Sequence, residues 1–213
     1  MIIKTFPSGP FSTNAYVVAC PHTLAAAIID PAPNSLEAIT SFITREKLKP
    51  VALLITHSHW DHIADAAAIA ARYQLPVFIH KLDKENLESP GSDGLPCWIT
   101  IPPLTPTNLI REGDTIPVGN LTFTVIHTPG HTPGGVCFYC PEEKVLFSGD
   151  TLFKGTIGNL SFSTARPELM WPSLTKLSLL PPETRVFPGH GDPTTIGHEK
   201  WLARAEEIFD NDF

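Results

Sequence analysis

The sequence contains no apolar run long enough to cross a bilayer. A membrane-spanning helix needs about 20 consecutive apolar residues, and none occurs among the 213 residues of the chain. The N-terminal stretch MIIKTFPSGPF also lacks the basic start, long apolar segment and cleavage site of a secretory signal peptide. We therefore expect a cytoplasmic protein that has no membrane partner.

Basic residues are also scarce. Lys and Arg number 15 against 22 Asp and Glu, which gives a net charge of -7, and they form no block. An acidic surface repels a phosphate backbone, so we expect no nucleic-acid partner or substrate. The hydrophobic content of 42% is enough for a large core, which argues against disordered and fibrous classes.

Cysteines are too few and too irregularly spaced for a disulfide scaffold. The four are Cys20, Cys97, Cys137 and Cys140, and the last two form a single CxxC within GGVCFYC. That segment has an apolar strand pattern, and strand positions three apart face opposite sides of a sheet. We interpret the cysteines as reduced, mostly buried thiols, and not as a zinc clip or a redox pair.

The remaining pattern predicts alternating strands and helices in two halves. In the first half, short apolar runs separated by turn residues predict a β-meander over the first thirty residues. A helix should follow, capped by Asn34 or Ser35, running to about Lys49 and stopped by Pro50. A strand at 51–56, a helix at 63–73 and a strand at 76–80 are expected next, and no regular structure between about 88 and 108.

The second half repeats this order of elements. The pattern predicts strands at 115–118, 121–127, 134–140 and 144–150, a helix near 167–180, a strand at 184–189 and a helix near 197–209. Two halves, about 1–105 and 110–213, would each pair a sheet with outer helices. We predict a single α/β (α+β) domain over 1–213, folded as a four-layer αββα sandwich.

The strongest chemical signal is the segment ITHSHWDHIAD. It places His57, His59, Asp61 and His62 between a buried strand and a helix. His57 and His59 are two apart, so on an extended strand end their side chains point the same way. Imidazole and carboxylate ligands suit zinc, manganese or iron, and the absence of cysteine from the cluster argues against a closed structural zinc site.

Three further candidates each follow a predicted strand and are flanked by glycine. They are His131 in VIHTPGHTPGG, Asp150 in KVLFSGDTLF and His190 in TRVFPGHGD. With the first cluster they give five histidines and two aspartates, which is enough for two adjacent metal ions with open positions. Asp150 is the natural bridging carboxylate, because it is one of only two acids in the set.

Four motifs together resemble the successive metal motifs of the metallo-β-lactamase superfamily: THSHWDH at 56–62, HTPGHTPGG at 127–135, GDTLF at 149–153 and PGHG at 188–191. Within it the chain most resembles the glyoxalase II-like hydrolases, especially a short bacterial branch without the long helical C-terminal domain. The resemblance implies the αββα fold and two divalent ions, zinc first, with iron or manganese as alternatives. It assigns His57, His59 and His131 to one ion and Asp61, His62 and His190 to the other, with Asp150 bridging.

The resemblance also implies a function. The two ions would share a water, lower its pKa and let the resulting hydroxide attack the carbonyl of a small acyl thioester such as S-lactoylglutathione. Asp61 and Asp150 are then the catalytic carboxylates. The alternatives are a persulfide dioxygenase with a single iron and a lactonase or lactamase on the same fold.

The loop after Asp150 departs from the pattern of full-length glyoxalase II enzymes, in which basic residues hold glutathione, so recognition of glutathione stays an open question. Asn159 stands near the place where full-length glyoxalase II enzymes carry a lysine, and Lys154 and Arg166 are interpreted as surface charges. The candidates for pocket walls are Trp60, Phe153, Phe162 and Trp171. Asp65 and the carbonyls of glycine-rich loops are candidates to orient the ligands. The other histidines match no ligand motif and are interpreted as surface or satisfied core residues: His22, His80, His127 and His198, of which His127, near His131, is the one that could orient a ligand.

Overall fold

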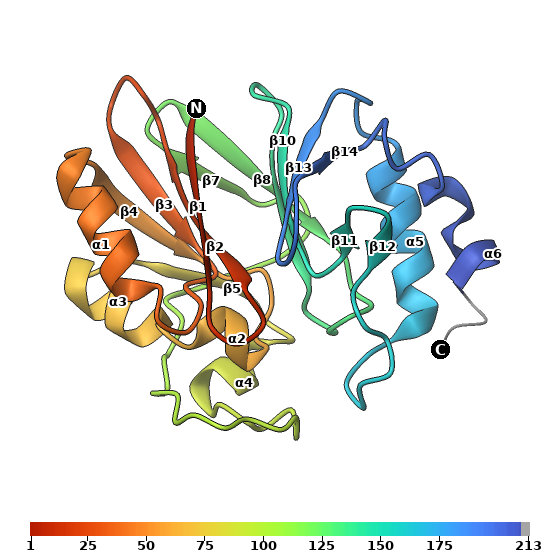
Figure 1. Ribbon diagram of the computed structural model, residues 1–213, viewed down its shortest axis with the longest axis horizontal. Helices are drawn as coiled ribbons and strands as arrows, with labels where there is room; N and C mark the ends of the chain where they lie inside the picture. Colours follow the sequence, from red (N-terminus) through yellow and green to blue (C-terminus); the bar gives the residue numbers. More distant parts are fainter. Residues whose placement is uncertain (210–213) are drawn as a thin grey trace.

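The computed structural model describes residues 1–209, so residues 210–213 of the expected domain lie outside the described residues. Two six-stranded mixed sheets pack face to face, with α1 and α3 on the outer side of one sheet and α5 and α6 on the outer side of the other (Figure 1). The predicted four-layer αββα sandwich is confirmed.

The first sheet has the strand order β1-β2-β3-β4-β5-β6. Strands β1 to β3 are antiparallel, as the predicted meander requires, and β3 to β6 are parallel. The elements of this half are β1 (Ile2–Ser8), β2 (Thr13–Ala19), β3 (Ala25–Ile29), α1 (Leu36–Arg45), β4 (Lys49–Leu54), α2 (Trp60–Ile63), α3 (Ala66–Tyr73), β5 (Val77–His80), α4 (Lys84–Glu88) and β6 (Asn108–Ile110).

The second sheet has the order β14-β13-β10-β9-β8-β7, in which only β10 and β13 pair in parallel. A small hairpin of β11 and β12 follows β10. The elements are β7 (Thr115–Val118), β8 (Leu121–His127), β9 (Val136–Cys140), β10 (Val145–Gly149), β11 (Leu152–Phe153), β12 (Thr156–Ile157), α5 (Pro167–Ser178), β13 (Arg185–Pro188), β14 (Thr194–Thr195), a 3-10 turn at Leu202–Arg204 and α6 (Ala205–Phe209).

Three layers of apolar side chains hold the sandwich together. A single strand can contribute side chains to two of these layers, one on each face of its sheet. On β2, Val17 packs toward α1 and α3, whereas Tyr16 and Val18 pack between the sheets. This alternation follows from the two-residue period of a strand and explains why β2 is buried along its whole length. Phe123 and Phe147 are fully buried between the sheets, and each contributes on the order of 2–3 kcal/mol.

The cysteine prediction is confirmed for the CxxC segment. Cys137 lies in the core cluster with α5, whereas Cys140 lies between the sheets, so the two thiols face opposite sides of β9. All four cysteines are free, and only Cys97 is exposed. Among residues 1–209 the structure contains no helix with the length and apolar character needed to cross a membrane.

The predicted C-terminal end of the first helix, at about Lys49, was wrong. It ends at Arg45, and Lys47 adopts a left-handed conformation with φ 53°. Pro50 lies inside β4, where the register with β3 shifts beside it. Proline lacks the N–H that a regular ladder needs, so the irregularity accommodates it without ending the strand.

Two other predicted helices are shorter than expected. The helix predicted at 63–73 is interrupted at residues 64 and 65, between α2, which already begins at Trp60, and α3, because the N–H of Asp65 donates to the carbonyl of Pro31 outside the helix. The last helical segment begins only with the 3-10 turn at Leu202 and becomes α6 at Ala205, because the buried carboxylate of Glu199 holds the preceding segment by accepting hydrogen bonds from Thr194 and Trp201. Residues 89–107 contain no helix or strand, as predicted.

Candidate metal centre

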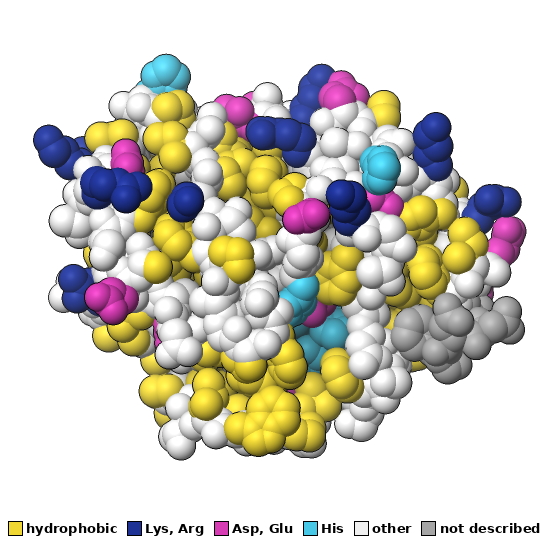
Figure 2. Space-filling model, in the orientation of Figure 1, with side chains coloured by type: hydrophobic (Ala, Val, Ile, Leu, Met, Phe, Trp, Pro, Cys, Tyr) yellow, Lys and Arg dark blue, Asp and Glu magenta, His cyan; other side chains and the backbone are white. Residues whose placement is uncertain are grey.

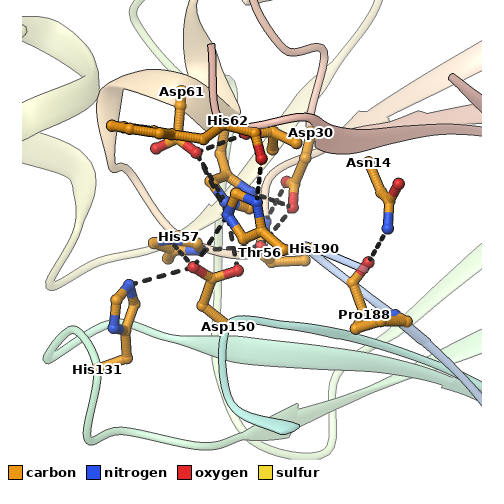
Figure 3. Close-up of polar contacts among 12 residues, drawn as sticks. Asn14, Asp30, Thr56, His57, Asp61, His62, His131, Asp150, Pro188 and His190 are labelled. Atoms are coloured by element: carbon orange, nitrogen blue, oxygen red, sulfur yellow. Dashed lines mark hydrogen bonds and ion pairs between the residues drawn. The ribbon is translucent and has the colours of Figure 1, made fainter. Parts of the chain in front are cut away.

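All seven predicted ligands lie together at the carboxyl ends of strands from both sheets, and Figure 3 labels all of them except His59. The loop after β4 and the short helix α2 carry the 57–62 cluster, while β8, β10 and β13 each lead to one further ligand. Parallel alignment of β3 with β4 and of β10 with β13 brings these chain ends to one rim of the sandwich. The residues brought together are His57, His59, Asp61, His62, His131, Asp150 and His190.

One group consists of His57, His59 and His131. All three are buried, and their candidate ligand atoms lie within 4.8 Å of one another. The Nε2 atom of each ring is buried and has no hydrogen-bond partner among the described residues. An unpartnered buried nitrogen is costly. Three of them facing one point fit a bound metal ion.

A second group consists of Asp61, His62 and His190, whose candidate ligand atoms also lie within 4.8 Å of one another. The Asp61 Oδ2 atom lies 3.4 Å from His190 Nε2 and 3.6 Å from His62 Nε2. The hydroxyl of Thr13 donates to the same carboxylate oxygen at 2.6 Å, which holds Asp61 toward the group. One carboxylate and two imidazoles again make a donor set suited to a divalent ion.

Asp150 lies between the two groups. Its Oδ2 atom is 3.4 Å from the Nε2 atoms of both His131 and His190, and its Oδ1 atom is 3.3 Å from His62 Nε2. Gly189 makes this approach possible, because a Cβ there would collide with the Asp150 carboxylate. A single carboxylate that faces imidazoles from both groups has the position of a bridge between two ions.

Backbone carbonyls fix the orientation of two imidazoles. The Nδ1–H of His131 donates to the carbonyl of Asn159 at 2.8 Å, and the Nδ1–H of His190 donates to that of Phe11 at 3.1 Å. A carbonyl only accepts, so in the neutral ring the lone pair is on Nε2, which points to the centre. Carbonyls of loops were among the predicted orienting groups; Phe11 itself was not foreseen.

Asp30, at the end of β3, is an orienting residue that the sequence reasoning missed. Its carboxylate accepts hydrogen bonds from the N–H and hydroxyl of Thr56 and from Nδ1 of His62 at 3.0 Å. The Thr56 hydroxyl in turn accepts from Nδ1 of His57 at 3.1 Å. Asp30 therefore orients ligands of both groups. The signal was present in the sequence, since IID ends a buried strand as the ligand motifs do.

Asp83 was also missed. This buried carboxylate accepts hydrogen bonds from the N–H of Ser58 at 3.0 Å, the hydroxyl of Thr132 at 2.9 Å and the N–H of Gly134 at 2.6 Å. Ser58 lies between two predicted ligands and Thr132 follows another. One side chain thus fastens the loop after β4 to the loop after β8.

In the metal-free protein, the surroundings of the imidazoles lower the pKa of some of them and raise the pKa of others. Burial lowers the pKa of His59 to about 3 and holds that of His57 well below its ordinary value. Burial also acts to lower the pKa of His190, but hydrogen bonds to Asp150 and Asp61 outweigh it and raise the pKa to about 9. The pKa of His62 is likewise raised well above its ordinary value, because Asp150 and Asp61 outweigh burial.

A cavity of about 210 Å³ opens over the ligands. Its polar floor includes His59, Asp61, His131, Asp150 and His190. Its walls are mostly apolar and come from Phe11, Trp60, Leu95, Phe153 and Phe162, with the amide of Asn159 at one side. Three of the four predicted wall residues therefore line it. Trp171 does not, because it lies on the buried face of α5 and packs in the core cluster beneath that helix.

Several other candidates lie away from this centre. Asp65 accepts a hydrogen bond from the N–H of Leu36 at 2.8 Å and caps α1, so its predicted orienting role was wrong. His127 stacks on His80 with ring centroids 4.1 Å apart, and its Nε2 pairs with the carbonyl of Pro133, so it orients no ligand either. Lys154 lies 3.8 Å from Asp192 at the surface.

The fold and this centre together define a metal-dependent hydrolase with a buried His/Asp metal site. The model of the Metallo-beta-lactamase superfamily matches residues 8–190, and the chain belongs to that superfamily.

Three proteins are similar to this chain in sequence or in structure. Hydroxyacylglutathione hydrolase GloC of Haemophilus influenzae is 35% identical over 182 residues, which are 82% of this chain and 84% of that protein. The crystal structure of BLEG-1, a B3 metallo-beta-lactamase, has a TM-score of 0.83 and 38% identity and covers 93% of this chain and 96% of its own. The crystal structure of TTHA1623 in a di-iron-bound form has a TM-score of 0.80 and 39% identity. The match covers 95% of this chain and 98% of that chain. The fold type and the resemblance to hydroxyacylglutathione hydrolases are confirmed.

Proposed function

We propose that the protein hydrolyses a small acyl thioester to a carboxylic acid and a thiol. The observation that carries the proposal is the position of Asp150, whose carboxylate faces imidazoles of two buried groups on the floor of a small apolar pocket. The 35% identity to GloC supports a thioester as the substrate.

In this proposal His57, His59 and His131 hold one divalent ion and Asp61, His62 and His190 hold a second, with Asp150 shared. The ligand set accepts zinc, iron or manganese; we propose zinc. Two such ions, when bound, would supply a water of lowered pKa and a Lewis acid for the substrate carbonyl.

The chain itself orients and shields the reaction. Asp30 and the carbonyls of Asn159 and Phe11 keep the ring nitrogens aimed at the centre. Burial acts to raise the pKa of Asp61, but His62 and His190 lower it to about 2, so its carboxylate stays ionised. Apolar walls keep bulk water from the acyl group.

Thioester hydrolysis needs no separate proton donor for the leaving group. The water oxygen forms a bond to the carbonyl carbon and its protons pass to solvent, while the C–S bond breaks and its electron pair leaves with sulfur. A thiol has a pKa near 8.5, so the thiolate departs readily at neutral pH. This suits the pocket, because among the described residues that line it the only acidic side chains are the two carboxylates assigned to the ions.

Elemental analysis of the purified protein, together with a thiol-release assay on a panel of acyl thioesters that includes S-lactoylglutathione, tests the proposal. We expect about two ions per chain and thiol release that a chelator abolishes and added metal restores. One iron per chain, oxygen uptake on a persulfide and no hydrolysis would instead establish a dioxygenase.

A second candidate function is hydrolysis of a β-lactam. It is favoured by the 38% identity to BLEG-1, since the same chemistry at the carbonyl opens a lactam ring. Turnover of a chromogenic cephalosporin, measured in the same preparation, separates the two candidates. A catalytic efficiency on the cephalosporin above that on every thioester would replace the first proposal.

A further inference from the structure

Three aromatic side chains from distant segments meet at the rim of the pocket. Phe11 lies between β1 and β2, Trp60 begins α2, and Trp98 belongs to the irregular segment at 89–107. The ring centroids of Phe11 and Trp60 are 5.4 Å apart, those of Trp60 and Trp98 are 5.7 Å apart, and those of Phe11 and Trp98 are 6.2 Å apart. We call these three residues the aromatic rim.

Two of the three side chains of the aromatic rim are exposed although they are apolar, and only Trp60 is buried. Trp98 is 71% exposed and Phe11 is 50% exposed, and Ile99 beside them is 45% exposed. Figure 2 shows apolar side chains gathered directly below the opening in which histidine and acidic side chains are visible. Contiguous apolar surface at the mouth of a polar centre is typical of a ligand-binding site.

The rim is continuous with the pocket, because Phe11 and Trp60 belong to both. Phe162 extends the apolar wall to the ligands themselves, since its ring centroid lies 5.4 Å from that of His59 and 5.7 Å from that of His131. A substrate group that enters between the rim and Phe162 would therefore contact aromatic faces from the surface down to the reacting carbonyl.

Among the described residues, the pocket walls also lack basic side chains that could bind a charged substrate group. None of the described residues that line the pocket is a Lys or Arg, and the neutral amide of Asn159 is the polar group outside the floor. Lys154 is 3.8 Å from Asp192 and lines a different cleft, and Arg166 donates to the carbonyls of Thr164 and Ala165. The walls thus provide no cation for the two carboxylates of a glutathione moiety.

We infer that the aromatic rim makes this enzyme selective for thioesters with an uncharged, apolar acyl group, aromatic or branched aliphatic, and that Trp98 is a specificity-determining residue. The inference rests on the proposed thioester hydrolysis. The bulky apolar group lies against the rim and Phe162, and the carbonyl lies over the ligand floor. A small hydroxyacyl group such as lactoyl does not contact the aromatic rim.

Four substrates test the inference with the metal-loaded enzyme: phenylacetyl and lactoyl thioesters, each of N-acetylcysteamine and of glutathione. We expect kcat/KM for phenylacetyl to exceed that for lactoyl by at least about tenfold on either thiol. Trp98→Ala should reduce that preference about tenfold, and Trp98→Phe should restore most of it. Leu179→Ala is the control, because Leu179 is 81% exposed at the end of α5, away from the pocket.

Binding of the product acids gives a readout that does not depend on turnover. Phenylacetate should quench tryptophan fluorescence of the loaded protein at lower concentration than lactate, and Trp98→Ala should abolish the difference. Thiol release that favours lactoyl substrates, or a preference that survives in Trp98→Ala, overturns the inference and leaves the thioesterase proposal intact. No thiol release from any substrate, with phenylacetate still bound preferentially, overturns the thioesterase proposal while the apolar selectivity of the rim stands.

Discussion

The buried carboxylate of Asp83 accepts a hydrogen bond from the backbone N–H of Ser58, between His57 and His59, at 3.0 Å. Through Thr132 and Gly134 the same carboxylate also holds the loop that carries His131. Asp83 therefore fixes the relative positions of the three imidazoles of the first group without touching them.

Asp83→Asn should reduce metal content at that group more than at the other. The amide offers one acceptor oxygen instead of two, which leaves buried donors unpaired and costs about 1–3 kcal/mol of stability. Metal analysis together with thermal unfolding measures both effects. Glu85→Gln, an exposed neighbour on α4, is the control and should change neither. Full metal content in a folded Asp83→Asn protein would remove its positioning role.

Asp30 and Asp65 should behave differently on substitution, although both are aspartates near the ligands. Asp30→Asn weakens hydrogen bonds to His62 and Thr56 and should lower metal affinity 10–100-fold, roughly the range found for such orienting partners. Asp65→Ala removes a helix cap and should cost about 1 kcal/mol of stability while metal affinity stays unchanged. Chelator competition and denaturant unfolding distinguish the two; equal metal loss in both variants would contradict the assignment.

Asp150→Ala should lose metal from both groups and most of its activity. The carboxylate faces His131, His190 and His62, so in the proposed two-ion arrangement its removal would take one ligand from each ion at once. His80→Ala should leave metal content unchanged, because His80 stacks on His127 away from the centre. Two equivalents of metal retained in Asp150→Ala would exclude a bridging role.

The metal-free protein should be most stable near pH 6.5. The pKa of His190 is raised to about 9 by Asp150 and Asp61 against the effect of burial, so the stability it contributes is present below 6.5 and is lost as pH rises through 9. Burial lowers the pKa of His59 to about 3, so unfolding is favoured as pH falls from 6.5 toward 3, where only the unfolded chain binds the proton. Chelator-treated protein unfolded at a series of pH values tests this, and stability that rises steadily from pH 6 to pH 9 would contradict it.

Bound metal should remove the alkaline part of this dependence. At pH 7.5 an ion must displace one proton from His190 and one from His62, both of which have raised pKa values in the metal-free protein. Calorimetric titration in buffers of different ionisation enthalpy counts these protons. Asp61→Asn should reduce the number released.

Local sequence patterns were enough to predict much of the fold. The short apolar run of β2 and the continuous apolar run of β4 were sufficient to predict strands and, with the order of elements, the layered sandwich. Element ends were less accurate, because the left-handed conformation of Lys47 follows the end of α1 and hydrogen bonds to Glu199 hold the segment before Leu202. For Asp65 the deciding partner is Pro31, which no local pattern could reveal.

The sequence by itself determined which side chains could hold metal, since seven histidines and aspartates in four short motifs follow predicted strands. Only the tertiary structure decided what surrounds them. Asp30 and Asp83 are ordinary acids in the sequence, and their roles exist because folding buries each beside donors far along the chain. The aromatic rim is likewise a product of folding, because it joins Phe11, Trp60 and Trp98 from segments that only the packed sandwich brings into contact.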